Sequence, residues 1–507
     1  MANQKANALT RSDFLRQIGA AAMAGISVPA LHAAARPNVL VIVTDDQGYA
    51  DLSAYSHAAA DVSTPSMDRI AAKGLLFTRA YVSAPVCSPS RAGWNTGRYP
   101  QRWDPSSGWT PGLPQDGKTI AEYFKSAGYA TAKVGKNDFG RGYHSQEGRE
   151  YPLNHGYDEF LGFSSHAHDY FLLSQGIEKK TPDPHGHSAA LGPLFENRGR
   201  RSFESGYLTD IFTDRAIQFL QRHRNQPFFL HLAYNSVHTL VHETPDRYVE
   251  KFGLKPIPKY DPGTMGKYVD YYDKYAELGN ISDKEMRKYY LANLACLDDN
   301  IGRLLDALDR LGLAENTLVI FFSDNGGTQH GGGSNRPLRG AKSSTFEGGI
   351  RVPFMMRWPG RLPAGKTYSY RISALDVLPT CLEAAGIRSD RSARLDGQSF
   401  LKAVQAGAPS PTERRPLFWL FRDRWAVLSG KWKLVRSGDP GGQPAYQILY
   451  YGDSADATSA LFNLTTDEAE QHDVSKDNPA VAERLNRLFD EWRREMRSEA
   501  MKQQRPQ

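Results

Sequence analysis

The stretch Val39-Leu-Val-Ile-Val-Thr-Asp-Asp46 decides the fold, because an apolar run ends directly in two acidic residues. A continuous apolar run of this length predicts a short strand buried on both faces, as in a parallel sheet covered by helices. Ligands of open α/β sheets bind beyond the carboxyl ends of the strands. The stretch therefore predicts a strand of a mainly parallel sheet and, at its end, part of a functional site.

Three further apolar runs end in polar residues in the same way: 318–322 before Asp324 and Asn325, 130–134 before Lys136, and 228–232 before Asn235 and His238. Such runs alternate with helical patterns from Pro37 to about Gly386, which predicts a large, mostly parallel α/β sheet sandwiched by helices. Because the carboxyl ends of parallel strands meet at one edge, we expect all four sets of polar residues to line one crevice.

The sequence pattern changes after about Pro416. Residues 425–435 predict two strands around a Ser429-Gly430 turn, and residues 480–496 predict a closing amphipathic helix. We therefore expect a main domain at 36–400 and a smaller C-terminal antiparallel α+β subdomain at 401–507. Within the main domain, a capping box at Ser282 and Glu285 predicts a long helix that ends before Gly312.

Residues 1–35 have the pattern of an export signal. Three basic residues precede an apolar, alanine-rich run at 18–30, and residues 33–35 offer a small-residue cleavage site. Residues 10–16 resemble a twin-arginine signal in which the second arginine is serine. The segment predicts a periplasmic or secreted protein with no stable membrane insertion, and a retained anchor is the alternative, since the run is short for a membrane span.

The charge of the chain is modest. The formal net charge is +6, and removal of residues 1–35, which carry three basic residues and one acidic residue, would leave +4. No clustered basic helix is visible in the sequence. We therefore expect no nucleic-acid partner.

Four residues after two of the predicted strands offer oxygen atoms as ligands: Asp45, Asp46, Asp324 and Asn325. Adjacent carboxylates repel one another unless a cation lies between them, so a hard divalent metal is the expected partner. A cage made only of protein oxygens favours calcium over magnesium. The alternative is that these residues are merely turn residues at strand ends.

Cysteine usage singles out one residue. Three cysteines cannot form a disulfide framework, and the surroundings of Cys296 and Cys381 predict small core residues. Cys87 instead lies between two prolines, with Arg91 four residues later. Arg91, like Lys136 and Lys342, has no obvious acidic neighbour in the sequence, and a pocket containing these cations would suit an anion.

The stretch Cys87-Ser-Pro-Ser-Arg91, followed by Thr96-Gly-Arg98, resembles the signature of the type I sulfatases, which have an alkaline phosphatase-like α/β fold. The resemblance covers most of the chain after residue 35, with blocks that also include 45–46, 128–136, 235–238, 324–327 and 337–353. It implies that residues 36–400 are a sulfatase catalytic domain. It also implies that a formylglycine-generating enzyme converts Cys87 to formylglycine (3-oxoalanine).

The resemblance implies a set of roles at the site. A hydroxyl of hydrated, modified Cys87 would attack sulfur, and the sulfated residue would then expel sulfate by carbon–oxygen cleavage. Modified Cys87 would join the four oxygen-bearing residues as a metal ligand, and Lys136 would help to neutralise the sulfate oxygens. Arg91 would hold the modified residue. Asp324 would accept the proton of the nucleophile. His238 and Lys342 would contact the sulfate and protonate the departing alcohol oxygen.

The sequence departs from the family pattern after Lys136. The family usually has an aromatic residue and then a histidine that deprotonates the second hydroxyl, whereas this chain has Asn137 and Asp138. Asp138 is either a substitute base or a residue that has turned away from the site. As a base it needs a nearby cation such as Lys136, because an anion beside bound sulfate is costly.

The substrate follows only by analogy with the family. A sulfated carbohydrate, as in polysaccharide degradation, or an aryl sulfate is expected, with His166 and His168 facing the leaving group. One alternative is a phosphonate monoester or phosphodiester hydrolase that uses the same modified cysteine. A non-enzymatic alternative is a protein that binds sulfated glycans, although a mere binder has no need for an aldehyde at position 87.

Overall fold

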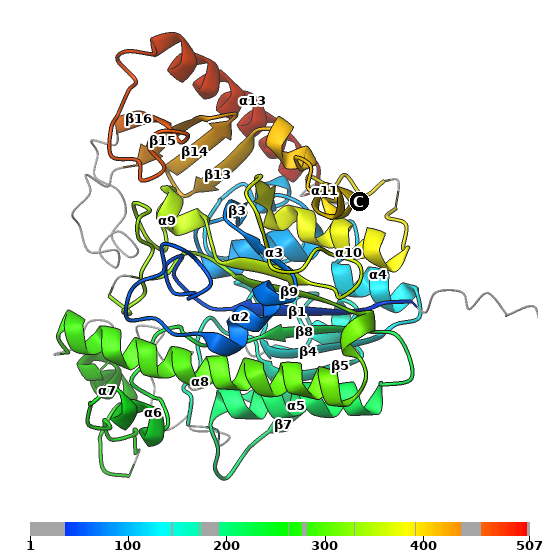
Figure 1. Ribbon diagram of the computed structural model, residues 1–507, viewed down its shortest axis with the longest axis vertical. Coiled ribbons are helices and arrows are strands. Elements are labelled where there is room, and N and C mark those ends of the chain that lie inside the picture. Colours follow the sequence, from blue (N-terminus) through cyan, green and yellow to red (C-terminus); the bar gives the residue numbers. More distant parts are fainter. Residues whose placement is uncertain are drawn as a thin grey trace, which may run out of the picture. The chain divides into compact units, whose positions relative to one another are not determined.

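The computed structural model describes residues 36–142, 145–171, 173, 192–261, 263–275, 281–328, 330–390, 392–437 and 458–503. Its main feature is a ten-stranded sheet with the order β11-β2-β10-β9-β1-β8-β4-β5-β6-β7 (Figure 1). The strands are β1 Asn38–Thr44, β2 Leu75–Phe77, β4 Ala130–Lys136, β5 Glu159–Phe163, β6 Leu194–Glu196, β7 Gly199–Arg201, β8 Phe228–Ala233, β9 Thr317–Ser323, β10 Phe354–Arg357 and β11 Lys366–Tyr368.

The centre of this sheet is parallel and its edges are mixed. Strands β9, β1, β8, β4 and β5 pair in parallel, whereas β10 is antiparallel to β9 and β6 is antiparallel to β5. The four apolar runs found in the sequence are β1, β9, β4 and β8, which lie side by side. Their carboxyl ends therefore share one edge, and the predicted mostly parallel sheet is confirmed.

Helices cover both faces of the sheet, as the uninterrupted apolar strands predict. In β1, Leu40 and Ile42 belong to one core with helices α2 Pro65–Ala72, α5 Leu208–Arg222 and α8 Asp283–Arg310. Val39, Val41 and Val43 belong to a second core with α3 Cys87–Thr96, α4 Ile120–Ser126 and α10 Val377–Ala385. Each fully buried aliphatic side chain of this kind contributes about 1.5–3 kcal/mol.

Helix α8 confirms the prediction made from its capping residues. The Ser282 hydroxyl accepts the Glu285 N–H at 3.4 Å and donates to the Glu285 carboxylate at 2.7 Å. The helix ends at Arg310, and Gly312 follows with φ 67°. Cys296 in α8 and Cys381 in α10 are buried free cysteines, as expected for core residues.

The C-terminal part contains a second, antiparallel sheet of β13 Leu417–Phe421, β14 Arg424–Ser429, β15 Trp432–Ser437 and β16 Thr458–Asn463. The long helix α13 Pro479–Gln503 packs on it through Phe489 and Trp492. The predicted hairpin around Gly430 and the closing helix are thus confirmed. The described residues from Pro37 onward form one compact unit, and the domain boundary near residue 400 stays a prediction.

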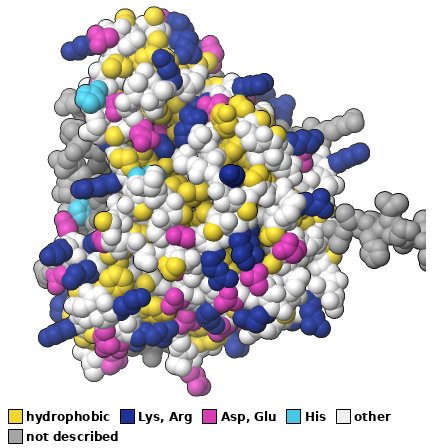
Figure 2. Space-filling view, viewed as in Figure 1, with side chains coloured by type: hydrophobic (Ala, Val, Ile, Leu, Met, Phe, Trp, Pro, Cys, Tyr) yellow, Lys and Arg dark blue, Asp and Glu magenta, His cyan; other side chains and the backbone are white. Residues whose placement is uncertain are grey.

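Shorter elements connect these layers: β3 Ala80–Tyr81, β12 Ile372–Ser373, α6 Asp246–Lys251, α7 Tyr268–Tyr275, α9 Glu347–Ile350 and α11 Leu401–Ala406. In the part of the chain that the structure describes, no helix is long and apolar enough to cross a membrane. The export signal predicted at 1–35 lies outside the described residues. On the face shown in Figure 2, basic and acidic side chains are interspersed.

Candidate active site

The acidic residues predicted to bind a metal lie together at the carboxyl ends of β1 and β9. These strands pair in register, with Thr44 opposite Ser323. The Asp46 N–H donates to Asp324 Oδ1 at 3.3 Å, and Asn325 Nδ2 donates to Asp46 Oδ1 at 2.6 Å. Asp45, Asp46, Asp324 and Asn325 are all buried. The topology has thus joined two pairs of residues that are far apart in the sequence.

Three buried cations from different segments bind these carboxylates. Arg91 in α3 donates from Nε to Asp324 Oδ2 at 2.9 Å. Lys136 at the end of β4 places Nζ 2.7 Å from Asp45 Oδ2, and Lys342 places Nζ 2.7 Å from Asp46 Oδ2. The fold therefore gives each of these cations an acidic partner that is distant in the sequence.

Burial and crowding shift the pKa values of these groups. Burial, followed by the charge of Asp45, raises the pKa of Asp324 to about 6. Burial also raises the pKa of Asp45, although Lys136 and Arg91 oppose it. Burial alone would lower the pKa of Lys136, but Asp45, Cys87 and Asp138 together outweigh it and the pKa rises. The lysine therefore stays charged inside the protein.

The oxygen atoms of this group fit a hard cation. Asp45 Oδ1 and Asn325 Oδ1 are buried without a hydrogen-bond partner, which is costly unless a ligand binds them. Asp45, Asp46 and His238 each offer a ligand atom, and these atoms lie within 4.8 Å of one another. Oxygen-rich groups of this kind suit Ca²⁺ better than softer metals.

His238 lies at the border of the acidic group, with Nε2 3.6 Å from Asp46 Oδ2. Burial lowers the pKa of His238 well below its usual value, and Lys342 and Lys136 lower it further. The imidazole is therefore neutral, and its Nδ1 is buried without a hydrogen-bond partner. This position suits either a metal or a bound anion, and the sequence analysis assigned His238 to the anion.

Cys87 is the first residue of α3 and is 2% exposed. Burial, followed by the nearby Asp138 carboxylate, raises the pKa of the thiol to about 12, while Lys136 and Lys342 act in the opposite direction. The thiol is thus protonated at neutral pH and is a poor nucleophile. Arg91 follows one helical turn later, so the same helix presents Cys87 and the partner of Asp324.

Asp138 is held beside Cys87 by a neighbour that the sequence analysis did not single out. The Ser88 hydroxyl donates to Asp138 Oδ1 at 2.6 Å, and Lys136 Nζ lies 3.4 Å from Oδ2. Burial would raise the pKa of Asp138, but Lys136, Ser88 and Arg91 outweigh it and bring the pKa to about 2. Ser88 lies inside the cysteine motif, and that adjacency was the one sequence signal for it.

A glycine permits Lys136 to reach its place. Gly135 has φ 103°, and a Cβ at this position would lie 1.9 Å from the carbonyl oxygen of Ala233 in the neighbouring strand β8. Any larger residue would push β4 away from β8. The close packing of these strands therefore brings Lys136 next to Asp45, which follows β1 on the other side of β8.

The two predicted substrate-binding histidines differ in their surroundings. His166 is partly exposed, and its charge lowers the pKa of both Asp138 and His238, so it lies near the site. Both ring nitrogens of the buried His168 lie near backbone carbonyls, 2.6 Å from Asp169 O and 2.9 Å from Gly192 O. The prediction that these residues face a leaving group stays a prediction for both.

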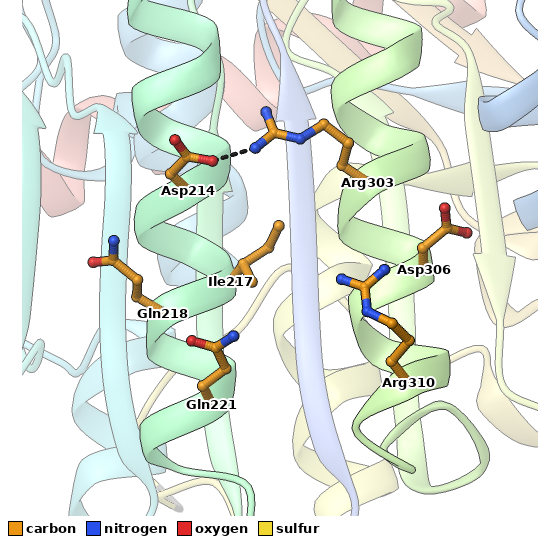
Figure 3. A pocket seen from close by; sticks show the side chains of 7 residues that line it. All are labelled: Asp214, Ile217, Gln218, Gln221, Arg303, Asp306 and Arg310. Atoms are coloured by element: carbon orange, nitrogen blue, oxygen red, sulfur yellow. Dashed lines mark hydrogen bonds and ion pairs between the residues drawn. The ribbon is translucent and has the colours of Figure 1, made fainter.

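A groove of about 410 Å³ lies elsewhere, between helices α5 and α8 (Figure 3). Its lining is mixed in charge: Asp214, Ile217, Gln218, Gln221, Arg303, Asp306 and Arg310. None of the predicted site residues lines this groove. Its two helices pack on one face of the sheet, whereas α3 with Cys87 packs on the other.

The fold and the charged cluster at its carboxyl edge define a hydrolase of the alkaline phosphatase-like superfamily. The family model described as Sulfatase matches residues 37–387, and one described as N-sulphoglucosamine sulphohydrolase, C-terminal, matches residues 341–497. The chain therefore belongs to the sulfatase family and is a sulfuric ester hydrolase.

Individual relatives agree with this assignment. An arylsulfatase of Hemicentrotus pulcherrimus is 30% identical over 80% of this chain and 70% of its own length. The N-acetylgalactosamine-6-sulfatase of Homo sapiens is 29% identical over 89% of this chain and 84% of its own length. The solved structure of Ps i-CgsB in complex with k-i-k-neocarrahexaose is 31% identical, has a TM-score of 0.73, and covers 91% of this chain and 93% of its own.

Proposed function

We propose that the protein removes sulfate from a sulfated carbohydrate, using a formylglycine made from Cys87 and a bound calcium ion. The observation that carries the proposal is the burial of Cys87 among Asp138, Lys136, Lys342 and Asp45, whose charges all act on its thiol. A buried, protonated thiol has little use as a nucleophile itself, but it is a suitable precursor for an aldehyde. The carbohydrate is suggested by the human relative and by the neocarrahexaose complex.

The charge balance of the site supports a divalent cation and an anionic substrate. The buried carboxylates of the site are Asp45, Asp46, Asp138 and Asp324, and the buried cations that pair with them are Arg91, Lys136 and Lys342. Four negative charges and three positive charges give the site a net charge of −1. A divalent cation would change this net charge to +1. A sulfate monoester carries one negative charge and would neutralise that positive charge in a medium where unpaired charge is costly.

The proposed ligands of the cation are Asp45, Asp46, Asp324, Asn325 and residue 87. When bound, calcium would offset negative charge on the sulfate oxygens, and a hydrated formylglycine would supply two hydroxyls on one carbon. The side chains of Lys136 and Lys342 would contact the sulfate oxygens, since both ammonium groups are already held at this edge by carboxylates. Arg91 would orient residue 87 through its fixed contact with Asp324.

Proton transfers are assigned to three residues. Asp324, whose pKa burial and Asp45 raise to about 6, would take the proton of the attacking hydroxyl. Lys342 would supply a proton to the departing alcohol oxygen. His238, which is neutral without substrate, would share this role once the negative charge of the bound sulfate has raised its pKa. The buried, unpartnered Nδ1 of His238 is consistent with a role toward substrate.

Asp138 is proposed to take the proton that the family's usual histidine would remove. The contacts of its carboxylate with Ser88 and Lys136 support this role. An anionic substrate beside Lys136 would compete for the ammonium group and raise the pKa of Asp138 toward the range in which a carboxylate accepts protons. The low pKa without substrate also keeps the side chain ionised and ready.

Maturation and location complete the proposal. We expect residues 1–35 to direct export to the periplasm or the medium and a formylglycine-generating enzyme to act on Cys87. Protein sequencing of the mature N-terminus would locate the cleavage, which is expected after residues 33–35. An N-terminus that starts at Met1 would contradict cleavage.

Peptide mass spectrometry across Cys87 tests the proposed nucleophile. The mature protein is expected to show the loss of mass that converts a thiol to an aldehyde at Cys87, with Cys381 unchanged as an internal control. A fully active protein with an intact Cys87 thiol would contradict the proposal. Kinetics with paired aryl sulfate and aryl phosphodiester substrates would follow, and a clear preference for the phosphodiester would favour the alternative hydrolase.

A further inference from the structure

The C-terminal sheet contacts the loop that carries Lys342, although it contributes none of the proposed reacting groups. In the middle of the loop the contact is made by Arg424 at the start of β14, which donates from Nη1 to the carbonyl oxygen of Ser343 at 2.9 Å. Arg424 is 0% exposed. A fully buried guanidinium thus binds the carbonyl group of the residue that directly follows Lys342.

The backbone of Ser343 connects the two sides of the active site. Its N–H donates to the carbonyl oxygen of Pro85 at 2.8 Å, and Pro85 lies two residues before Cys87. Ser343 has φ 72°, a left-handed conformation that costs a residue with a Cβ roughly 1–2 kcal/mol. Such a conformation persists only where surrounding groups hold it, and Arg424 is one of those groups.

The far end of the same loop is also held by the C-terminal part. The Glu347 N–H donates to Glu470 Oε2 at 2.6 Å, and Lys433 Nζ lies 2.9 Å from Glu347 Oε1. At the start of the loop, Arg339 donates to the Glu470 carbonyl oxygen at 3.1 Å. The segment 339–347 is therefore fixed at both ends and in its middle by residues that follow position 423.

We propose that Arg424 is a positioning residue that orients Ser343 so that the Lys342 ammonium group reaches Asp46 and the substrate sulfate. This inference rests on the proposed role of Lys342. A lysine side chain is long and flexible, so its place is defined only if its backbone is held. Misplacing a catalytic group by about 1 Å can cost a factor of about 10² in rate.

The direct test compares Arg424→Met and Arg424→Lys with the unchanged protein. The rate of para-nitrophenyl sulfate hydrolysis is measured per folded molecule that carries the aldehyde, with aldehyde content taken from mass spectrometry. Arg424→Met is expected to lower kcat by about 10- to 100-fold with little change in KM. Arg424→Lys keeps the charge and one donor and is expected to recover part of the loss.

Arg371 offers a matched control. It is also a buried arginine, 1% exposed, and donates to the backbone carbonyl oxygens of Gly430 and Glu413 at 3.1 and 2.8 Å. Arg371→Met is expected to lower the free energy of unfolding but to leave kcat per folded molecule unchanged. An equal loss of kcat in Arg371→Met and Arg424→Met would mean that Arg424 is only structural.

A double-mutant cycle with Lys342→Ala separates the two proposals. If Arg424 acts through Lys342, then adding Arg424→Met to Lys342→Ala lowers kcat by no more than about twofold. If the losses of kcat in the two single variants multiply in the double variant, the positioning role is wrong. It is also wrong if Arg424→Met keeps an unchanged kcat while Lys342→Ala is inactive. Full activity in Lys342→Ala would instead refute the proposed role of Lys342, and the positioning role with it. If Arg424→Met does not fold, the same double-mutant cycle is measured with Arg424→Lys in its place.

Discussion

The protein buries two clusters of charged side chains that look alike in composition and differ in how their atoms are paired. The active-site cluster consists of Asp45, Asp46, Asp138, Asp324, Arg91, Lys136 and Lys342. The junction cluster, between the C-terminal sheet and helix α9, consists of Glu347, Lys433 and Glu470. In the junction cluster Lys433 Nζ lies 2.9 Å from a carboxylate oxygen of each glutamate, and Tyr81 donates to Glu347 at 2.8 Å.

The active-site cluster is different because some oxygens there have neither a hydrogen bond nor an ion pair. Glu470 Oε1 of the junction cluster also lacks a hydrogen bond, but it lies 2.9 Å from Lys433 Nζ. Asp45 Oδ1 and the neighbouring Asn325 Oδ1 are buried without a hydrogen bond. A buried, unpaired oxygen is costly, so its presence beside paired charges indicates a ligand rather than a structural brace. Buried charge by itself therefore does not distinguish the two clusters, whereas the oxygens that lack both a hydrogen bond and an ion pair do.

The largest effect is expected from Cys87. Cys87→Ala should lower kcat for sulfate ester hydrolysis by about 10⁶-fold, because the aldehyde precursor is lost. Binding of sulfated glycans should persist, since the buried cations remain. The measurement is turnover of protein matured with the formylglycine-generating enzyme, together with glycan retention.

Cys381→Ala provides the comparison, since Cys381 is a buried thiol of α10 in the apolar core. It is expected to lose a little stability and no activity. Undiminished activity of Cys87→Ala would show that Cys87 does not provide the nucleophile. The functional difference between the active-site cluster and the rest of the interior would then also be unsupported.

Removal of calcium should produce the next largest effect. A chelator is expected to lower activity by about 10³-fold, with recovery on addition of Ca²⁺. Calcium at a hundred times its dissociation constant should also stabilise the fold by about 2.7 kcal/mol, seen as a rise in Tm. Asp45→Asn should lose this calcium-dependent rise.

Asp298→Asn is the matched variant for Asp45→Asn. Asp298 is a buried carboxylate of α8 that accepts the N–H groups of Ser66 and Met67 at 3.0 and 2.8 Å, away from the active-site cluster. It should reduce stability but keep the response of Tm to calcium. If calcium does not change the Tm of the unchanged protein, the proposal that a metal binds at the active-site cluster is wrong.

Asp138→Asn should lower kcat by about 10²-fold if the carboxylate accepts a proton during turnover. Asp138→His, which restores the residue usual in the family, should keep more activity than the asparagine variant. Steady-state kinetics with a sulfate ester measure both. A wild-type kcat in Asp138→Asn would mean that Asp138 has only a structural role, like the residues of the junction cluster. Its contacts with Ser88 and Lys136 would then serve packing and not proton transfer.

The smallest effect concerns the pH dependence of the junction cluster. Burial, opposed by Lys433 and reinforced by Glu347, raises the pKa of Glu470 to about 7. A carboxyl group with a raised pKa in the folded state contributes stability below its unfolded pKa and loses it as pH rises through the folded pKa. Between pH of about 4.5 and 7 the free energy of unfolding should therefore fall by about 1–3 kcal/mol more than in Glu470→Gln. Chemical unfolding of both proteins over this range measures the difference, and parallel curves would disprove it.

The fold was largely predictable because its signals are local. The run in Val39-Leu-Val-Ile-Val43 identifies a strand buried on both faces, and the structure divides its side chains between two cores. Ser282 and Glu285 mark the start of α8 by capping, which depends on neighbours three residues apart. The antiparallel strands β6, β7 and β10, which flank the parallel centre of the sheet, were not predicted, because short strands of three or four residues carry little periodicity.

The site was predictable in its residue types and less so in its pairings. The cysteine motif and the residues after β1 and β9 were visible in the sequence, and the structure brings them together. The contact of Ser88 with Asp138 and that of Arg424 with Ser343 were not foreseen. Nothing in the local pattern of the hairpin at Arg424 shows that it reaches the active-site loop.

The chain by itself determined which segments become strands and helices and which of their ends carry charge, since both follow from the polarity of near neighbours. Only the tertiary structure decided which carboxylate each cation meets, which oxygens stay unmatched, and how far burial moves the pKa values of Cys87, Asp138 and Glu470. The physical reason is that electrostatic energy in a poorly polarisable interior depends on distances between side chains, and these distances are set by strand order and packing rather than by separation along the chain.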